Sequence, residues 1–509
     1  MEILPAKELP FALVLLMVAA VLYRYVQYSK GPMIDHIPIL GKELGGVDKR
    51  KSEYAKNGLS MLKTGYQQYS RGVVRIDTAD GPRILLGPEL LEEVKSKPDS
   101  VVDNRGPIRE SISAKYTALP ETDAIMLHNI KAELTPKLGA LNEKLSKEVD
   151  YAVKVELPEA KDWTPVKGYA KLLRIVAMAS TRIFLDSDLA HNEEWLETSI
   201  GYTVSVANGS RMIKQWRPWL RPFVYRFLPE IRKLHETRAT AIRLLKPIIQ
   251  ERRESEGKEG YEKPNDFLQW MMDARIKKHL RDKDYYYQAE LQLVLSFAAI
   301  HTTTNAVTNM LYDLGTMPDV VDMIRQEVKE ELEKTNGVWD GKLMKSLKKT
   351  DSFMKESQRH NPIGYTLFTR RILKPFTLSD GTYLPAGANV TSNSHMISHD
   401  SDFVGDNPWE FDALRYYKKS LASDGPAKEA AGKHQFVSLS MGSQMFGYGR
   451  HACPGRFFAG NEIKLILVKI LMSYDIKLEN TTERYKNFSW EGSNMPDVSK
   501  NILIKRLQT

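Results

Sequence analysis

Residues 446–455, which read FGYGRHACPG, carry more information about the architecture than any other part of the chain. They contain Cys453, the only cysteine among the 509 residues. Gly447 and Gly449 permit tight backbone turns and the close approach of a flat ligand, and Pro454 suits the first turn of the helical pattern that follows. A sulfur atom at a helix N-terminus is stabilised as a thiolate, which predicts a metal ligand. The alternative is a buried, inert thiol.

Five positions of this loop resemble the haem-binding loop of the cytochrome P450 monooxygenases: Phe446, Gly449, Arg450, Cys453 and Gly455. Five fixed positions would coincide by chance at a frequency of about 10⁻⁴ over a chain of this length. The resemblance implies a mainly α fold with a smaller β portion and a haem b whose iron takes the Cys453 thiolate as axial ligand. It also implies that Arg450 contacts a haem propionate.

Composition excludes several other classes of protein. Apolar residues make up 42% of the chain and charged residues 27%, which is typical of a globular protein and argues against disorder and a multi-spanning membrane protein. One cysteine excludes an intramolecular disulfide and a zinc site with two or more cysteine ligands. The net charge of +9 suits an anionic membrane surface or an acidic partner, and we expect no nucleic-acid partner.

An apolar run near the N-terminus predicts a membrane anchor. Residues 9–23 read LPFALVLLMVAAVLY, and Tyr25 and Val26 extend the run toward the roughly 20 residues needed to span a bilayer. Basic residues are concentrated after the run, so the positive-inside rule places the large domain in the cytosol. A cleaved signal peptide is the alternative, although no small-x-small cleavage site follows. We expect a single-pass anchor in the endoplasmic reticulum membrane over residues 1–30.

The rest of the chain predicts a connector and start of the domain over residues 31–60 and one catalytic domain over residues 61–509. Tyr285 to Leu314 shows an uninterrupted helical pattern that could run about 45 Å through the domain. The other expected elements are a hairpin at 73–86, helices at 319–333, 342–359 and 460–474, strands within 364–392 and at 502–505, and polar loops at 250–265 and 422–433.

A charge cluster is the next feature that the resemblance implies. Glu356 and Arg359 stand at helical i,i+3 spacing, and Arg415 follows in a segment similar to the one that supplies a second arginine in the family. We expect these three residues to form a buried structural cluster that supports the cysteine side of the haem. Taken alone, the Glu356–Arg359 pair could equally be a surface salt bridge.

The long helix contains the sequence AIHTTT at residues 299–304, where the family usually has Ala-Gly-x-acid-Thr. Thr302 aligns with the threonine that helps to deliver protons during oxygen activation, and Thr303 stands next to it. Ala299 replaces the glycine and His301 replaces the acid. His301 could relay protons or could simply be packed in the core, and the threonines could bond back to the helix and bend it.

The propionate contacts are less well defined. The Trp-x-x-x-Arg pair of the family is missing, and the corresponding region offers His128 or Lys131 as substitutes. Arg370 and Arg371 are further candidates, of which Arg371 is preferred, and one of this adjacent pair should point outward because strand side chains alternate.

The resemblance implies an oxidoreductase that uses O2 and electrons from NADPH to hydroxylate or further oxidise a hydrophobic small molecule. No flavin or nicotinamide fingerprint is present, so NADPH–cytochrome P450 reductase must be a separate partner, with cytochrome b5 as a candidate second donor. Lys433, Arg450 and Arg456 are candidates for the docking face.

The loop and the AIHTTT segment together look similar to filamentous-fungal members of secondary metabolism, such as ent-kaurene oxidase-like enzymes. That placement predicts a terpenoid or polyketide intermediate as substrate. Two alternatives remain open: a haem-thiolate isomerase or dehydratase that needs no external reductant, and a non-enzymatic haem binder in which His301 coordinates the iron.

Overall fold

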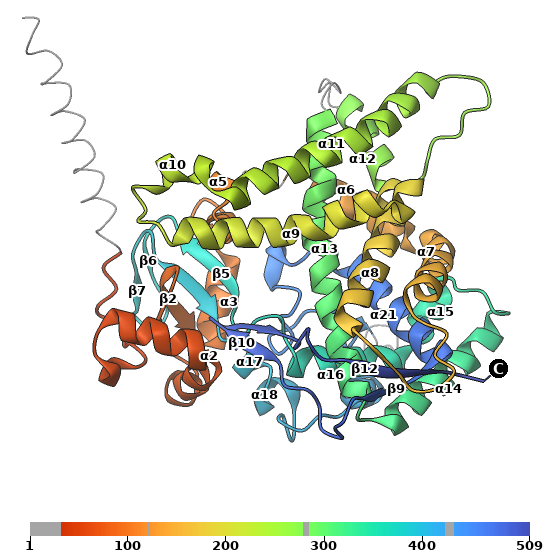
Figure 1. Cartoon of the computed structure of the whole chain (residues 1–509). Helices are drawn as coiled ribbons and strands as arrows, with labels where there is room; N and C mark the ends of the chain where they lie inside the picture. Colours follow the sequence, from red (N-terminus) through yellow and green to blue (C-terminus); the bar gives the residue numbers. More distant parts are fainter. Residues whose placement is uncertain (1–31, 118, 121–122, 278–284, 423–431, 509) are drawn as a thin grey trace, which may run out of the picture.

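The computed structural model describes residues 32–117, 119–120, 123–277, 285–422 and 432–508. Its central element is α13 (Tyr285–Leu314), which runs through the middle of the molecule (Figure 1). Most of its side chains are buried because helices surround it, as expected for a helix that is apolar on several faces. The long helix is helical from Tyr285, the first described residue after the gap at 278–284, and ends at Leu314, as the apolar pattern predicts.

Most of the molecule is helical and surrounds α13. Two long helices, α9 and α11, cross over it at the top of the view in Figure 1, and α8 and α21 pack along its sides. The helices before α13 are α2 (Val47–Tyr69), α3 (Pro88–Ser96), α4 (Arg105–Ser111), α5 (Ala114–Thr117), α6 (Ala124–Asn129), α7 (Thr135–Glu156), α8 (Gly168–Leu185), α9 (Glu193–Lys214), α10 (Arg221–Val224), α11 (Pro229–Ser255) and α12 (Phe267–Lys277). The helices after it are α14 (Pro318–Lys334), α15 (Gly341–Ser346), α16 (Lys348–His360), α17 (Ser394–Ile397), α18 (Ser401–Val404), α19 (Arg415–Ala422) and α21 (Arg456–Ser473).

Short helical turns join several of these elements. A π-helical turn at Ile130–Leu134 lies between α6 and α7. The 3-10 turns are η1 (Lys42–Leu44), η3 (Asp188–His191), η4 (Tyr225–Phe227) and η5 (Gly449–His451).

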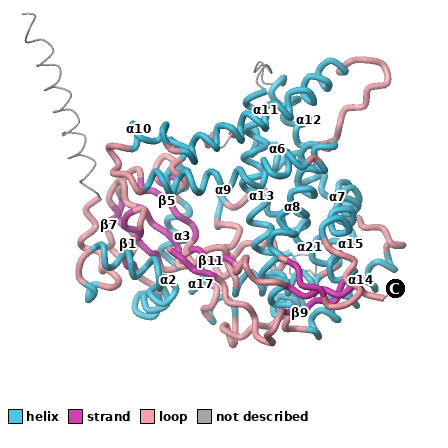
Figure 2. Tube along the Cα trace, viewed as in Figure 1, coloured by secondary structure: helices cyan, strands magenta, loops and turns pink. Residues whose placement is uncertain are grey.

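The strands gather in two main groups, which Figure 2 shows in magenta. The larger sheet has the order β1-β2-β8-β5-β3, in which only the β2–β8 pair is parallel. Its strands are β1 (Val73–Thr78), β2 (Gly81–Leu86), β3 (Val102–Asp103), β5 (Leu367–Ile372) and β8 (Asn389–Ser392). The second sheet is antiparallel with the order β4-β12-β9, and its strands are β4 (Thr164–Val166), β9 (Tyr474–Leu478) and β12 (Ile502–Arg506). Two small hairpins complete the strands: β6 (Phe376–Thr377) with β7 (Tyr383–Leu384), and β10 (Phe488–Trp490) with β11 (Ser493–Met495).

The predicted loop at residues 250–265 begins too early. Helix α11 continues through this charged stretch to Ser255 because Arg252 is drawn into the core. Its guanidinium donates to both carboxylate oxygens of Asp266, at 2.8 and 2.5 Å, and to the carbonyl of Leu185 at 2.7 Å. An arginine can be buried when all its donors are paired. The high proportion of charged residues was therefore not enough to predict where the helix ends.

The predicted helix at residues 342–359 is two helices, α15 and α16, which are separated at Leu347. The buried carboxylate of Glu327, from α14, accepts hydrogen bonds from the backbone N–H groups of Lys349 and Thr350, at 2.6 and 2.8 Å. A side chain from another helix therefore caps the first turn of α16, which local sequence could not reveal.

The predicted connector at residues 31–60 already contains the first half of α2, whose Tyr54 packs in the core. The expected loop at 422–433 falls largely outside the described residues, as does the anchor segment within residues 1–30. Among the helices that the structure describes, none is long and apolar enough to span a bilayer.

Candidate active site

The Cys453 loop is closed by backbone hydrogen bonds and ends at the N-terminus of α21. The N–H of Cys453 donates to the carbonyl of Phe446 at 2.7 Å, and Gly455 is the N-cap of α21. Gly447 and Gly449 adopt φ values of 81° and 76°, a region that favours glycine. A Cβ atom on Gly447 would also lie 3.2 Å from the backbone of Ala452. The two glycines therefore bring the chain back so that its cysteine begins the helix.

The Cys453 side chain is exposed, although burial raises the pKa of its thiol. Both observations hold for a sulfur that is surrounded by protein on most sides and remains accessible on one side. The backbone N–H groups of Gly455 and Arg456, and the charge of Arg456, oppose the effect of burial on this pKa. A thiol in this setting is converted to the thiolate most readily by a bound metal cation, since a coordinating thiol is deprotonated outright.

Two residues of α13 border accessible space as well. Ala298 and Thr302 are exposed at i,i+4 spacing, although they lie in the middle of a helix that other helices enclose. The Thr302 hydroxyl donates to the carbonyls of Ala298 at 2.7 Å and Ala299 at 3.2 Å. Thr302 therefore presents its side chain to the open face of α13 while its hydroxyl is held against the helix.

Thr303 and His301 turn away from that face. Thr303 is buried, and its hydroxyl donates to the carboxylate of Glu462, on α21, at 3.3 Å. The His301 ring lies between α8 and α9, with Nε2 3.0 Å from the carbonyl of Ile200 and Nδ1 3.4 Å from the hydroxyl of Tyr169. Burial holds its pKa below the usual range. Because both ring nitrogens have partners on neighbouring helices, this geometry favours packing over a proton relay or iron ligation.

The side chains of Arg370 and Arg371, in β5, point to opposite faces of the strand, as predicted. The buried residue is Arg370, however, and not Arg371, which was preferred as the propionate ligand. Arg371 points outward and forms a bidentate ion pair with Glu110 at 2.5 and 2.6 Å. Arg370 is buried, yet among the described residues its guanidinium donates only to the carbonyl of Thr369, at 2.9 Å, and lies 4.0 Å from the Phe368 ring. Burial lowers the pKa of Arg370 to about 10. A buried arginine with no carboxylate within ion-pair distance among the described residues calls for an external anion.

Arg370 shares a small hollow with cationic and hydrogen-bonding side chains from the Cys453 loop and from α3. Its lining comprises Val94, Lys95, Lys97, Val102, Phe368, Arg370, Tyr448, Arg450 and His451. Arg450 is half-exposed and donates to the carbonyl of Lys97, and it lies 3.3 Å from Asp99. Arg450 thus lies beside the hollow, but its guanidinium is already engaged by the loop that follows α3.

His128 and Lys131, the substitutes considered for the missing arginine, are both exposed, on α6 and on the π-helical turn. Neither forms a hydrogen bond or ion pair with another described residue. Their side chains are therefore free to meet an anion, but nothing in the geometry selects one of them.

The structure brings Glu356, Arg359 and Arg415 together in the core. Arg359 forms two hydrogen bonds to the Glu356 carboxylate, at 2.8 and 2.6 Å, and Arg415 forms one at 3.1 Å. Burial alone would raise the pKa of Glu356, but the hydrogen bonds from Arg359 and His360 hold it well below its usual range. The remaining arginine N–H groups donate to backbone carbonyls of the segment 398–410. The cluster therefore fixes the chain that leads to the Cys453 loop.

These observations fit a haem. An accessible cysteine at a helix N-terminus can ligate iron. Ala298 and Thr302 leave one face of α13 open, and the buried Arg370, which has no carboxylate partner among the described residues, suits a propionate. A side chain at position 449 would collide with Lys95 of α3, so glycine there allows the loop to pack closely against that helix. Sequence reasoning missed Glu462 and did not show which arginine of the Arg370–Arg371 pair is buried. The signal in the sequence for Glu462 is an acid within the mostly apolar stretch FFAGNEIKLIL.

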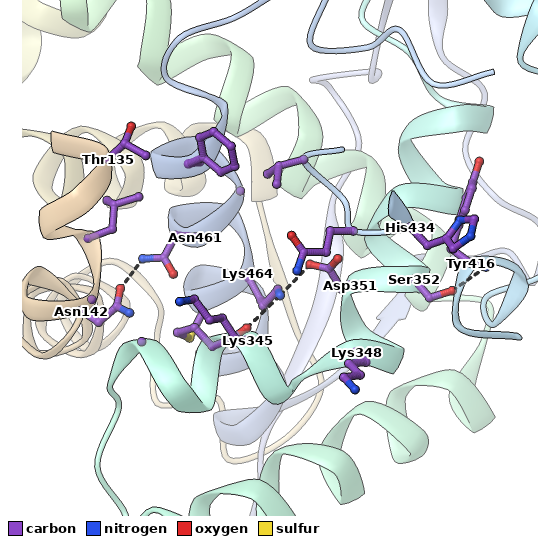
Figure 3. Close-up of a pocket in the computed structure, with 18 of the residues that line it drawn as sticks. Thr135, Asn142, Lys345, Lys348, Asp351, Ser352, Tyr416, His434, Asn461 and Lys464 are labelled. Atoms are coloured by element: carbon purple, nitrogen blue, oxygen red, sulfur yellow. Dashed lines mark hydrogen bonds and ion pairs between the residues drawn. The ribbon is translucent and has the colours of Figure 1, made fainter. Parts of the chain in front are cut away.

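A separate cavity of about 430 Å³ lies on the outer side of α21, between α7, α15, α16 and α19 (Figure 3). Its walls include Leu138, Met344 and Phe457, and a buried ion pair joins Lys464 to Asp351 at 2.6 Å. The cavity borders the helix that follows Cys453 rather than the exposed face of α13.

Comparison with known proteins agrees with this geometry. The family model described as cytochrome P450 matches residues 130–504. Cytochrome P450 monooxygenase braC of Annulohypoxylon truncatum is 35% identical over 483 residues, which cover 95% of each chain. Cytochrome P450 monooxygenase paxP of Penicillium paxilli is 35% identical over 455 residues, covering 88% of this chain and 86% of the relative.

A solved structure titled retinoic acid bound cyanobacterial CYP120A1 superposes on this fold with a TM-score of 0.66. The alignment covers 90% of this chain and 96% of that one, at 18% sequence identity. At this low identity the likeness concerns the fold alone.

Proposed function

Because this chain belongs to the cytochrome P450 family of haem-thiolate monooxygenases, we propose that it oxidises a hydrophobic terpenoid or polyketide intermediate of fungal secondary metabolism. Electrons reach it from NADPH through a separate reductase. The observation that carries the proposal is the accessible Cys453 at the start of α21, with the buried Arg370 beside the same loop. The substrate class rests on the resemblance of the loop and of residues 299–304 to fungal enzymes of that kind.

Cys453 would hold the iron and Arg370 would hold a propionate. When bound, haem supplies the activation of O2 and the oxidation of a C–H bond. The N–H groups of Gly455 and Arg456 stabilise the negative charge on sulfur, as donors at a helix N-terminus do. Arg370 offers a desolvated positive charge, so the ion pair with a propionate would be stronger than at the surface.

Thr302 is the residue that we propose for handling protons on the opposite wall. Its hydroxyl is exposed, and it can rotate from the Ala298 carbonyl toward a water or substrate oxygen without leaving the helix unsatisfied, because the backbone bonds remain. His301 would not share this role, since Ile200 and Tyr169 occupy its ring nitrogens.

An aromatic and basic surface around α10 supports a location at a membrane. Trp216, Trp219, Phe223 and Phe227 are 41–79% exposed, and the basic residues Arg217 and Arg226 lie among them. Tryptophan and arginine are favoured at the boundary between lipid headgroups and acyl chains. We propose that this surface rests on the cytosolic face of the endoplasmic reticulum membrane, beside the anchor expected within residues 1–30, and that an apolar substrate enters from the bilayer.

The cavity in Figure 3 is our candidate for the reductase contact. Lys345 and Lys348 are exposed at its rim, and neither forms an ion pair with another described residue. An acidic segment of a flavoprotein with an apolar side chain would match this combination of charge and pocket. Of the docking residues expected from sequence, Arg456 donates to the carbonyl of Cys453 at 3.0 Å and Lys433 is exposed beside the cavity residue His434.

The test is turnover of the full-length haem enzyme with NADPH–cytochrome P450 reductase in phospholipid vesicles, screened against terpenoids and polyketides. We expect substrate-dependent NADPH consumption and one oxygen atom from ¹⁸O₂ in the product. Product formation without reductase and O2 would instead identify an isomerase or dehydratase. Lys345→Glu with Lys348→Glu should raise the KM for reductase while leaving substrate binding unchanged.

A further inference from the structure

Glu462 is a buried acid for which the function described so far has no use. It lies on α21, nine residues after Cys453, and its side chain is completely buried. Its carboxyl group contacts two hydroxyls: Ser180 of α8 at 2.7 Å and Thr303 of α13 at 3.3 Å. Among the described residues no cation lies within ion-pair distance of it. Buried acids normally have a cation or several donors, so this one invites explanation.

The hydroxyls of α13 show what is unusual about Thr303. Those of Ser296, Thr302, Thr304 and Thr308 each donate to the carbonyl four residues earlier, at 2.7–2.9 Å. This back-bonding is the ordinary behaviour of serine and threonine inside a helix. Among the serine and threonine hydroxyls of the described α13 residues, only that of Thr303 donates to a side chain of another helix.

The exception changes the surroundings of Thr302. If Thr303 bonded back in the same way, it would occupy the carbonyl of Ala299. Because Thr303 bonds to Glu462 instead, the Ala299 carbonyl is open to the Thr302 hydroxyl. This hydroxyl donates to it at 3.2 Å, in addition to its bond to the Ala298 carbonyl. Thr302 is the threonine on the exposed face of α13, so the contact with Glu462 affects how the hydroxyl at the site is held.

The same contact fixes two walls of the site relative to each other. Helix α21 begins directly after the Cys453 loop, and α13 carries Thr302. Glu462 connects these helices through Thr303 and connects both to α8 through Ser180. A buried hydrogen-bonded group between three helices restricts their relative movement.

We propose that Glu462 is a positioning residue for oxygen activation: it draws the Thr303 hydroxyl out of the α13 back-bonding pattern and thereby sets the Thr302 hydroxyl and the spacing between α13 and the Cys453 side. This inference rests on the proposed monooxygenase function. Burial raises the pKa of Glu462 to about 8, opposed by its hydrogen bonds to Ser180 and Thr303, so the group acts as a neutral acid at neutral pH. A neutral amide of the same shape should therefore replace it.

The experiment compares Glu462→Gln, Glu462→Leu and Thr303→Val as full-length haem enzymes. Glu327→Leu is the matched control, since Glu327 is also a buried acid that bonds to a threonine, but it caps α16 and forms no hydrogen bond to a described residue of α13. Each enzyme is turned over with NADPH and reductase without added substrate, and the hydrogen peroxide released per NADPH consumed is measured. The reduced, carbon-monoxide-bound spectrum, the melting temperature and the infrared carbonyl band of the neutral carboxyl group are recorded on the same samples.

We expect the peroxide fraction to rise severalfold in Glu462→Leu and Thr303→Val and to stay near the wild-type value in Glu462→Gln. The infrared band of a buried neutral acid should disappear in both Glu462 variants and persist in Thr303→Val. Glu327→Leu should lower the melting temperature without changing the peroxide fraction.

The proposal is overturned if Glu462→Leu and Thr303→Val lower only the melting temperature, as the Glu327 control does, or if Glu462→Gln is as defective as Glu462→Leu. If Glu462→Leu does not fold, Thr303→Val decides alone, because it removes one hydroxyl and keeps the side-chain shape. Failure of the monooxygenase assignment would look different, since the wild-type enzyme itself would then lack the red-shifted carbon-monoxide band.

Discussion

Two segments supply most of the candidate site, and they encode it in different ways. The loop at residues 446–455 sets its geometry through its own backbone: two glycines with positive φ, a hydrogen bond from Cys453 to Phe446, and a helix that begins at once. The segment at residues 298–304 is regular helix, in which His301 and Thr303 bond to neighbouring helices whereas Thr302 and Thr304 bond back to α13. The sequence of the loop therefore predicts its structure locally. On α13 the sequence alone does not show which contact each side chain makes.

The largest effect should follow from a substitution of Cys453 in the loop at residues 446–455. Cys453→Ser should abolish the red-shifted carbon-monoxide band and all turnover, because no other cysteine is available to the iron. Difference spectroscopy of the reduced protein measures this. Ala452→Ser, one residue away, is the control and should keep the band. An unchanged band in Cys453→Ser would mean that another residue holds the iron.

The support beneath the loop should be the next most sensitive part. Arg359→Ala leaves the fully buried Glu356 with Arg415 as its remaining close cation, so the free energy of unfolding should fall by about 3–5 kcal/mol. Denaturant titration of the holoenzyme measures the loss. Lys147→Ala, which breaks the exposed pair with Glu143, should have no measurable effect. Equal losses in both variants would argue against a special role for the cluster.

On α13, Thr302 and Thr304 offer a matched pair. Both back-bond to the helix, but Thr302 is exposed and Thr304 is buried. Thr302→Val should lower product formation by roughly 10²-fold with an unchanged carbon-monoxide spectrum, as expected for the loss of a group that assists proton transfer. Thr304→Val should retain activity. If Thr304→Val were the more damaging change, the hydroxyl that matters would lie on another face of the helix.

The groups near the two regions should also lose their contributions to stability at opposite ends of the pH scale. Burial and neighbouring charges lower the pKa of His395 to about 3 and of His399 to about 2, beside the cluster under the loop. As the pH falls below about 6.5, these two histidines become protonated in the unfolded chain but stay neutral in the folded protein. The free energy of unfolding therefore decreases. The pKa of Glu462 is raised to about 8, so its contribution is lost as the pH rises from about 4.5 through about 8.

Each of these groups should contribute a slope of up to about 1.4 kcal/mol per pH unit. Unfolding free energies at several pH values measure the slopes. Glu462→Gln should flatten only the alkaline limb, and His399→Phe should flatten only the acid limb. A single variant that altered both limbs would show that the regions are not independent.

The smallest effect on catalysis should come from His301. His301→Leu removes the partners of the Ile200 carbonyl and the Tyr169 hydroxyl, so it should cost about 1–3 kcal/mol of stability. The peroxide fraction should not change, since neither ring nitrogen faces the exposed side of α13. A rise in peroxide as large as that of Thr302→Val would restore the histidine as a proton relay.

The same contrast explains how much could be predicted from sequence. The end of α13 at Leu314 and the hairpin at residues 73–86 follow from local periodicity and turn residues, and the cysteine loop follows from its motif. The end of α11, the break at Leu347 and the orientation of His301 depend on Asp266, Glu327 and Ile200, which lie 14 to 101 residues away. Arg370 and Arg371 could be recognised as an alternating pair, but only the ion pair with Glu110 decides which one points outward.

The solitary thiol has a practical consequence. Since Cys453 is the one cysteine of the chain and is accessible, a small thiol-reactive dye can attach at a single known atom, and it needs an alkaline pH because burial raises the pKa of this thiol. Labelling would compete directly with metal ligation at that sulfur. The dye-to-protein ratio of a preparation should therefore count the molecules that have not received their prosthetic group, without the need for an engineered reporter.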